Sequence, residues 1–359
     1  MAIQTYGLSA ARIAKFKGEI LKHAAPMEVL SKGGRQVKMP KNNSDTYVAR
    51  RWVPYGASAT YGAGGKGPNR FFANGTGDRS AAMVTAHVTS EGVTGTPESM
   101  VAQDITVVVQ QYACLYGFTD KTYDLYEDDI PAAMKEQIGE RVALVNEQIV
   151  YGALKATTNQ YYGGAGTSVA TVNGGLTLNL LRKIARNLQA NHGKPVTSVL
   201  KASGNYATEA VAPGYVVYCH TDLEPDIRDL AGFIPAEKYA SGTPMPNEIG
   251  KVERFRFITS PDLPSRQDAG ADVGTTGLYS TTGTKIDVYQ IIVSAADAWS
   301  QIAVRGLESL DPTFLPPGQK TKSDPHGQRG YAGSKWYKAV MLENDGWVAC
   351  ANVGAKALA

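Results

Sequence analysis

The sequence has few cysteines and no long apolar run. Its 3 cysteines, Cys114, Cys219 and Cys350, lie far apart and show neither the spacing of a zinc motif nor that of a disulfide framework. Such sparse, unpaired cysteines are typical of a reducing compartment. No segment approaches the roughly 20 apolar residues that span a bilayer, and the first residues lack the apolar core of a signal peptide. We therefore expect a soluble, cytoplasmic protein with no membrane partner.

The sequence also lacks the motifs that carry catalysis. The 5 histidines are scattered, and none stands in the HExxH spacing of a zinc hydrolase. In residues 62–67 a glycine follows the lysine, where a phosphate loop needs Ser or Thr. His220 and Asp222 would supply two metal ligands or an acid–base pair, but no third residue is identifiable, and a solvated turn before Pro225 is the simpler interpretation. We predict no catalytic residue, no metal site and no cofactor.

Strong charge of either sign is missing as well. The 36 basic and 33 acidic residues leave a net charge of +3, far below the basic excess of a dedicated nucleic-acid-binding protein. This balance is compatible with a surface that faces DNA without gripping it. Apolar residues at helical spacing predict an amphipathic helix over residues 8–24, ended by Pro26. We interpret it as a terminal arm docked on its own fold or on a neighbour, and its basic face comprises Arg12, Lys15, Lys17 and Lys22.

Glycine is the residue that the chain has in excess. The 38 glycines exceed one residue in ten, where about 7% is usual. Many lie between two segments, 44–53 and 105–118, whose β-branched and aromatic residues predict strands. The connection of about fifty residues is rich in Gly, Ala, Ser and Thr, and it is too long for a loop of a compact domain. We predict a long β-hairpin arm, which cannot bury its own surface and needs another chain to lie on.

The strongest local pattern predicts a long helix that ends near Lys155. Pro131 suits a first helical turn, and the acidic Asp128 and Asp129 favour the same end. Apolar residues then recur at steps of three and four along one face. At about 1.5 Å per residue, such a helix is a stiff beam roughly 40 Å long. The apolar face comprises Ile130, Met134, Ile138, Val142, Val145 and Ile149.

The second half of the chain predicts an inserted α+β domain. A helix capped by Thr177 follows the glycine-rich residues 163–175, and short strands and turns alternate up to about residue 306. We interpret the basic Arg182, Lys183 and Arg186 of that helix as its solvated face instead of a phosphate contact. Two strand-like runs then flank Asp345-Gly346, which predicts a hairpin turn.

Four blocks of sequence stand in a recognisable order. They are QQYACLYGFTDKTYDLYEDD (110–129), LTLNLLRKIARNLQANHGKP (176–195), NEIGKVERFRFITSPDLP (247–264) and DPHGQRGYAGSKWYKAVMLENDGW (324–347). The first leads into the long helix, and the last carries Asp-Pro, Gln-Arg-Gly and Gly-x-Lys motifs. In sequence and order these blocks resemble the major capsid proteins of tailed bacteriophages with the Hong Kong 97-type fold.

The resemblance implies an α+β fold of five parts. These are an N-terminal arm (1–43), an extended β-hairpin loop (44–118), a peripheral domain with the long spine helix (119–170), an axial domain (171–309) and a return to the peripheral domain (310–359). The extended loop would lie over a neighbouring subunit, and we assign to it Gly56, Gly62, Gly65, Lys66, Arg70 and Gly92.

The same resemblance implies a function and partners. Subunits would form hexamers and pentamers of an icosahedral shell around packaged double-stranded genomic DNA. A portal, a separate scaffold chain and possibly cement proteins would be further partners, and assembly would occur in the host cytoplasm. Some relatives cross-link through a Lys–Asn isopeptide bond. Lys66 lies where such a lysine would stand, but its partner is not recognisable, so we expect a non-covalent shell.

Three alternatives stay open at this point. An encapsulin-type nanocompartment would share the fold but enclose a cargo protein. A tail or portal component would form a ring or tube. A soluble α+β hydrolase would use His220 and Asp222 and would exist as a monomer or small oligomer.

Overall fold

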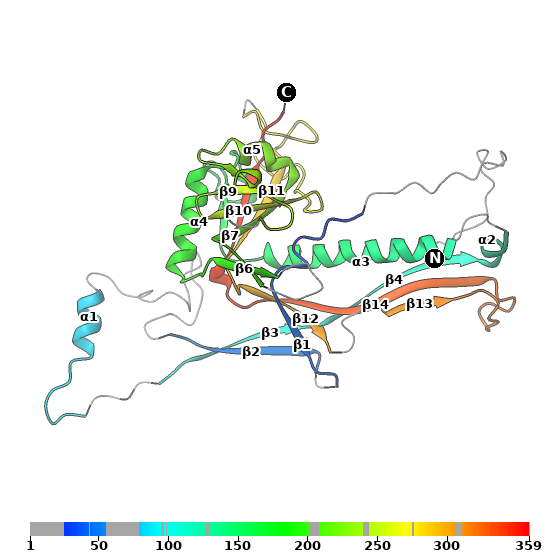
Figure 1. Ribbon diagram of the computed structural model, residues 1–359, viewed down its shortest axis with the longest axis horizontal. Helices are drawn as coiled ribbons and strands as arrows, with labels where there is room; N and C mark the ends of the chain where they lie inside the picture. Colours follow the sequence, from blue (N-terminus) through cyan, green and yellow to red (C-terminus); the bar gives the residue numbers. More distant parts are fainter. Residues whose placement is uncertain are drawn as a thin grey trace.

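The computed structural model describes residues 25–42, 44–54, 79–94, 97, 99–125, 130–200, 208–239, 244–274, 276–305 and 311–358. An upper domain lies above the middle of the molecule, a long helix with its sheet extends to one side, and a two-stranded arm extends to the other (Figure 1). Within the described ranges, no helix combines the length and hydropathy that crossing a bilayer needs. Several predicted residues lie outside these ranges, namely Arg12, Lys15, Lys17, Lys22, Gly56, Gly62, Gly65, Lys66 and Arg70.

The upper domain is built on one mixed sheet that is covered on both faces. Every residue of β10, β11 and β15 is buried, as expected for strands without a solvent face. The sheet contains, in spatial order, β5 (Gln160–Tyr162), β15 (Val348–Gly354), β11 (Val288–Ser294), β7 (Thr208–His220), β10 (Phe255–Ser260), β9 (Glu248–Val252) and β8 (Ile234–Pro235), with β6 (Val196–Leu200) paired to β7.

Helices cover one face of this sheet. The helices α4 (Leu178–Ala190) and α5 (Glu224–Arg228) share a core with it, and Thr177 caps α4 as predicted by accepting the N–H of Leu180 at 3.3 Å. The other face packs on the end of the long helix and on residues 29–30. Short 3-10 turns complete the domain: η2 (Val169–Thr171), η3 (Thr221–Leu223) and η4 (Ala236–Lys238).

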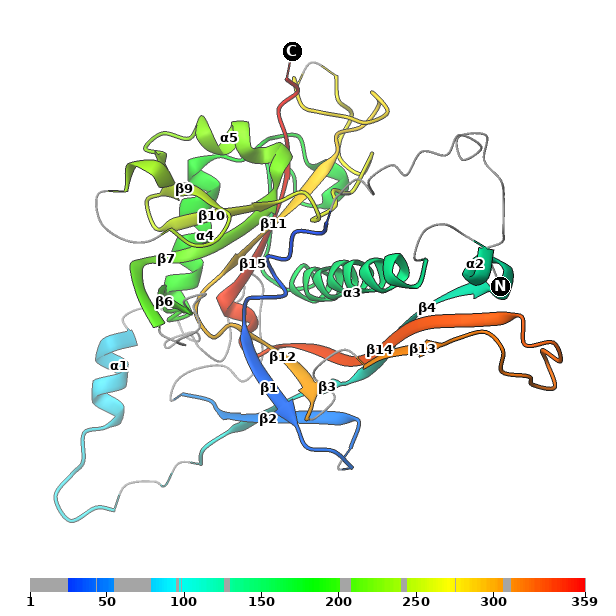
Figure 2. The same cartoon turned by 45° about the vertical axis from the view of Figure 1, so that its right-hand side comes forward.

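The long helix is α3 (Ile130–Leu154), whose 25 residues confirm the predicted beam. It lies along a lower sheet, where Met134, Ile138 and Val142 pack against Phe118 and Trp336. Figure 2 shows the helix and the strands side by side. The lower sheet comprises β4 (Gln110–Thr119), β14 (Arg329–Leu342), β13 (Asp311–Leu315), β12 (Trp299–Val304) and β1 (Arg35–Met39), and α2 (Asp120–Leu125) follows β4.

The arm begins with an antiparallel pair, β2 (Thr46–Trp52) and β3 (Ala102–Val108), and carries α1 (Arg79–Ala86). The pairing confirms that the two predicted strands flank the glycine-rich segment. Residues 105–118 are two strands instead of one. The break falls at Val109, which is buried under the lower sheet and donates its N–H to Asp45 O at 2.8 Å.

The hairpin predicted at Asp345-Gly346 is wrong. A 3-10 turn, η5 (Asp345–Trp347), stands there, and the strands on its two sides belong to different sheets. β15 pairs with β11 and β5, so residues 348–354 belong to the upper domain. The sequence had predicted that all of residues 310–359 return to the peripheral domain. The Asp345 carboxylate accepts hydrogen bonds from the hydroxyls of Thr157 and Thr158, so the turn is fixed to the segment that follows α3.

Candidate functional site

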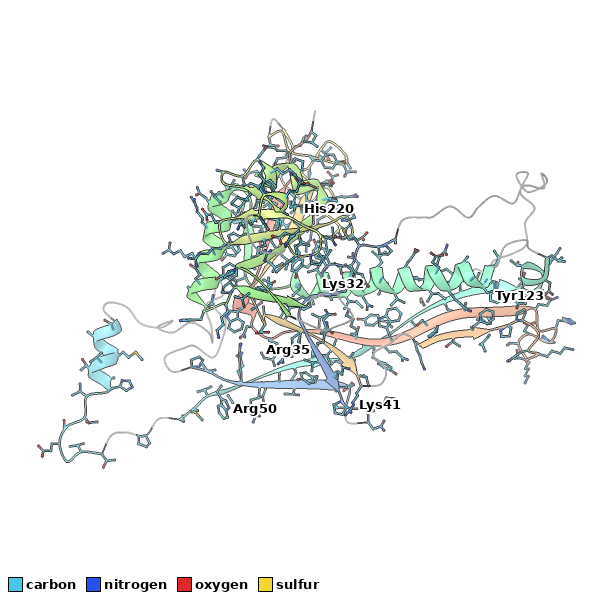
Figure 3. The ribbon with its side chains drawn as sticks, in the orientation of Figure 1. Lys32, Arg35, Lys41, Arg50, Tyr123 and His220 are labelled. Carbon is cyan, nitrogen blue, oxygen red and sulfur yellow. The ribbon has the colours of Figure 1, made fainter. Side chains whose placement is uncertain are left out.

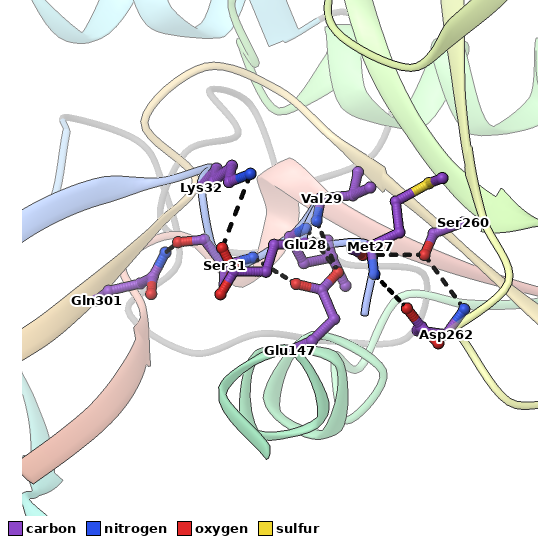
Figure 4. A network of polar contacts seen from close by, with 10 residues as sticks. Met27, Glu28, Val29, Ser31, Lys32, Glu147, Ser260, Asp262 and Gln301 are labelled. Atoms are coloured by element: carbon purple, nitrogen blue, oxygen red, sulfur yellow. Dashed lines mark hydrogen bonds and ion pairs between the residues drawn. The ribbon is translucent and has the colours of Figure 1, made fainter. Parts of the chain in front are cut away.

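A buried polar network joins residues 27–33 to Glu147 of α3 (Figure 4). Glu147, which is 1% exposed, accepts three backbone N–H groups: Oε1 from Val29 at 3.2 Å and Leu30 at 2.7 Å, and Oε2 from Ser31 at 2.8 Å. Hydrogen bonds from backbone N–H groups to a carboxylate are strong and need no cation. The segment that leads out of the predicted N-terminal arm is therefore fixed to the spine helix.

Further side chains hold the same segment on both sides of Glu147. The N–H of Met27 donates to Asp262 Oδ2 at 2.6 Å, and Ser260 Oγ donates to Met27 O at 3.2 Å. Gln301 Nε2, on β12, donates to Ser31 O at 2.8 Å and to Gly33 O at 2.6 Å. The upper domain, α3 and the lower sheet thus meet on this one stretch of chain.

Lys338 supplies positive charge near this network. Burial in β14 lowers the pKa of its ammonium group to about 8, and the carboxylates of Glu147 and Glu28 oppose that effect. A buried lysine is costly to ionise, and nearby carboxylates offset part of the cost.

Sequence reasoning missed Glu147 and placed the last turns of the apolar face slightly wrong. Val145 is half-buried and packs on the core of the lower sheet. Ile149 is also only half-buried, whereas Val150, Tyr151 and Leu154 are almost fully buried. The buried stripe shifts because α3 leaves the lower sheet and enters the upper domain. The only signal in the sequence for this polar network was the carboxylate of Glu147, which lies next to the second apolar stripe.

The arm has one face that the chain covers and one that it leaves exposed. Tyr47 and Ile105 pack on the lower sheet. On the opposite face Val48, Trp52 and Val108 are 52%, 57% and 52% exposed. Figure 3 places Arg50 on this arm, where its guanidinium forms two hydrogen bonds with Asp104, at 2.7 and 2.8 Å. Contiguous exposed apolar side chains mark interaction sites on soluble proteins.

More exposed apolar residues continue along the arm and the beam. Gly92 lies in the described part of the loop and has φ +76, a left-handed conformation that glycine adopts without strain. Among the described residues, the other large exposed apolar side chains on these parts are Val84, Val88, Val93, Met100, Val101, Leu115, Tyr123, Leu125, Leu144 and Leu315.

His220 and Asp222 form a turn and not a catalytic pair. The N–H of Asp222 donates to His220 Nδ1 at 3.0 Å, and Asp222 Oδ2 lies 3.2 Å from the same nitrogen. Tyr289 donates its hydroxyl to Asp222 at 2.7 Å. Burial raises the pKa of the neighbouring Cys219 thiol, so it carries no reactive thiolate. Within the described residues, no group of three or more His, Cys, Asp or Glu could hold a metal ion.

The family model described as phage capsid protein matches residues 102–314, more than half of the chain. The chain belongs to the phage capsid protein family. The match begins in the arm and includes α3, α4 and most of the upper domain. Membership in this family identifies a structural protein and not an enzyme, so the hydrolase alternative is not favoured.

One curated protein and several solved structures are similar to this chain. The major capsid protein of Pseudomonas phage KPP21 is 23% identical over 257 residues, which cover 65% of this chain and 64% of that relative. The match thus spans less than two thirds of the relative's length.

Three solved capsids share the architecture over nearly all of both chains. The capsid of Ralstonia phage GP4 gives a TM-score of 0.62 at 11% identity, with 100% of each chain covered. The head structure of Helicobacter pylori bacteriophage KHP40 gives 0.56 at 10% identity and 98% of each. The capsid of Cyanophage P-SCSP1u gives 0.54 at 12% identity, 99% of this chain and 97% of the other. At such identities the likeness shows the fold, and it confirms the predicted Hong Kong 97-type α+β fold.

Proposed function

We propose that this chain is a major capsid subunit, and that its copies assemble into the hexamers and pentamers of an icosahedral shell that encloses packaged double-stranded DNA. The observation that carries the proposal is the outer face of β2 and β3. A two-stranded sheet is marginally stable alone, and here only one of its faces has a core. A second copy that covers Val48, Trp52 and Val108 would complete the packing.

The layout of the fold supports a shell subunit. The arm and the beam extend in opposite directions from the upper domain (Figure 1), so one copy can reach several neighbours. Extended elements add buried area at each contact without enlarging the core of the subunit. Residues 79–94, which include α1 and Gly92, would belong to the part of the extended loop that lies over a neighbour.

The remaining partners follow from the same proposal. The shell would have genomic DNA on its inner face, with the basic residues of the N-terminal arm near it, and a portal at one vertex. A scaffold chain and cement proteins are further expected partners, and assembly would occur in the host cytoplasm. The encapsulin alternative is not favoured, because the family and its relatives are phage capsid proteins.

Negative-stain electron microscopy of the purified recombinant chain tests the proposal. We expect closed particles, tubes or flat sheets of capsomers. A chain that stays in discrete small particles at every concentration and salt concentration would contradict self-assembly.

A pair of variants makes this test specific to the arm. Trp52→Asp places a charge on the exposed face without disturbing a core, so the melting temperature should stay at the parent value while assembly is lost. Trp52→Phe, the matched control, keeps the aromatic surface and should assemble. If Trp52→Asp assembled as well as the control, the outer face of the arm would not be an interface.

A further inference from the structure

Acidic and basic residues are segregated within the upper domain. Residues 148–208 contain no Asp or Glu, but they include Lys155, Arg182, Lys183, Arg186, Lys194 and Lys201. Residues 221–238 show the opposite balance, with Asp222, Glu224, Asp226, Asp229 and Glu237 against the basic Arg228 and Lys238. The chain as a whole is nearly neutral, so this separation is local.

The basic side of the domain is the outer face of α4. Its apolar residues Leu181, Ile184 and Leu188 are fully buried against the sheet, which turns Lys183 and Arg186 outward. Lys183 lies over the Tyr161 ring at 6.0 Å, and Arg186 forms no ion pair within the described residues. Arg182 on the same helix is paired with Glu253 at 2.6 Å, so the positive charge that remains on this face is carried by Lys183 and Arg186.

The acidic side consists of η3, α5 and the turns after them. Asp222 has 49% of its side chain exposed, and Glu237 is also exposed. Two pairs reduce the charge: Arg228 contacts Glu224 at 2.6 Å and Lys356 contacts Asp229 at 2.7 Å. A small negative excess remains after these pairs, because Lys238 follows Glu237 and Asp226 is buried.

The two sides lie apart on one layer of the domain. α4 and α5 pack on the same face of the upper sheet and share one core. Figure 1 shows α4 at one margin of the upper domain and α5 near its top. One copy therefore presents both a positive and a negative margin, and a second copy can dock head to tail.

We infer that the upper domains of neighbouring copies contact each other through the basic face of α4 on one copy and the acidic margin around α5 on the next. This contact rests on the proposed capsid function. It would set the direction in which subunits follow one another around each hexamer or pentamer. An isologous contact would set α4 against α4, with like charges facing each other. Unlike patches generate heterologous contacts, which close into rings. Complementary charge sets partner choice and register more than raw affinity.

A second copy fits the basic face better than DNA does. The matching negative surface is part of the same chain, in the same layer of the same domain. The basic patch also lies at a side margin in the view down the shortest axis of the molecule (Figure 1), where lateral neighbours would lie in a thin shell. DNA as the occupant is one outcome of the test below.

The test reverses each side in the full-length chain. One variant carries Lys183→Glu with Arg186→Glu, the second carries Asp229→Lys with Glu237→Lys, and the third combines all four changes. Far-UV circular dichroism and the melting temperature establish that each variant folds. The readout is the protein concentration at which assemblies form at low salt, measured by sedimentation and electron microscopy.

We expect each single-sided reversal to raise that concentration about tenfold or more, since about 1.4 kcal/mol is a tenfold change. The four-fold variant should recover the parent value, and an equimolar mixture of the two single-sided variants should co-assemble because each matches the other. Recovery by charge reversal is an effect that mere damage to either surface would not produce.

Three results would overturn the contact. The first is unchanged assembly by the single-sided variants. The second is a four-fold variant no better than either single-sided one. The third is a loss of DNA binding upon Lys183→Glu with Arg186→Glu while assembly stays normal, which would assign α4 to nucleic acid. If the parent chain itself failed to assemble, the proposed function would fail, and this result is distinguishable from the other three.

Discussion

Replacing Glu147 should release the N-terminal segment from the spine helix. In Glu147→Ala the N–H groups of Val29, Leu30 and Ser31 lose their acceptor in a buried site, and each unsatisfied donor costs about 1–3 kcal/mol. The segment can escape this cost by leaving the body. Escape exposes Val29 and Leu30, now 9% and 0% exposed, at about 1.5–3 kcal/mol for each side chain. Because the segment takes the cheaper of the two routes, we expect a loss of about 3–6 kcal/mol in the free energy of unfolding.

Glu147→Gln should have a smaller effect with a different pattern. The amide keeps one oxygen where Oε1 accepts the N–H groups of Val29 and Leu30, but its NH2 group faces the N–H of Ser31. We expect about half of the loss seen for alanine, with amide exchange increased mainly at Ser31.

Urea unfolding of the unassembled chain gives the free energies, and hydrogen exchange of residues 27–31 gives the location. Glu136→Ala on the exposed side of the same helix is the control, and it should stay within about 0.5 kcal/mol of the parent. If Glu147→Ala matched this control in both measurements, the carboxylate would not hold the segment and the argument would be refuted.

The remaining predictions concern stability as well. The pKa of Lys338 is about 8 in the folded state, below its unfolded value, so between these two pH values the unfolded state binds more protons and the free energy of unfolding should rise with pH. Lys338→Met should remove that rise and stabilise the chain at pH 7. An equal dependence of stability on pH in both proteins would contradict this prediction. A Cβ at Gly330 would overlap the buried Phe118 ring, so Gly330→Ala should cost about 1–3 kcal/mol in urea unfolding. Gly139→Ala, with open space around its Cβ in α3, should stabilise by about 0.5–1 kcal/mol, and a loss there would refute the contrast. The buried Glu248–Arg256 pair has side chains 0% and 4% exposed, and Glu248→Leu alone should cost about 3–5 kcal/mol. Adding Arg256→Met should recover only part of this loss in the same assay, because the N–H of Met245 and the hydroxyl of Tyr239 also lose Glu248 as their acceptor.

Sequence patterns correctly predicted the elements that pack against a single sheet along their whole length. Met134, Ile138 and Val142 face one uninterrupted sheet, so a single helical stripe described them correctly. The stripe failed at Val150 and Leu154 because the partner of the helix changes there from a sheet to a domain. Both stripes are apolar, so the only mark of the change in the sequence is the carboxylate of Glu147 beside the second stripe.

The missed features depend on contacts between distant segments. Asp345-Gly346 has the composition of a hairpin turn, but β14 and β15 find better partners in separate sheets, and the carboxylate binds Thr157 and Thr158 instead. Glu147 binds backbone N–H groups of Val29, 118 residues earlier, and of its neighbours. Backbone donors have no residue identity, so no sequence pattern could have named them.

The arm shows how the surfaces that assemble can still be recognised from sequence. In β2 the inward Tyr47 and Ala49 alternate with the outward Val48 and Trp52, so both faces carry apolar side chains. A strand with two apolar faces is expected to be buried on both. The structure buries one face and leaves Val48 and Trp52 exposed on either side of Arg50, and the proposed subunit contact would cover them. The same reasoning applies to α4, where an acid-free segment turns basic residues outward and the matching acids lie elsewhere in the same domain. In both cases a composition that the single subunit does not explain becomes reasonable once a second copy is placed against it.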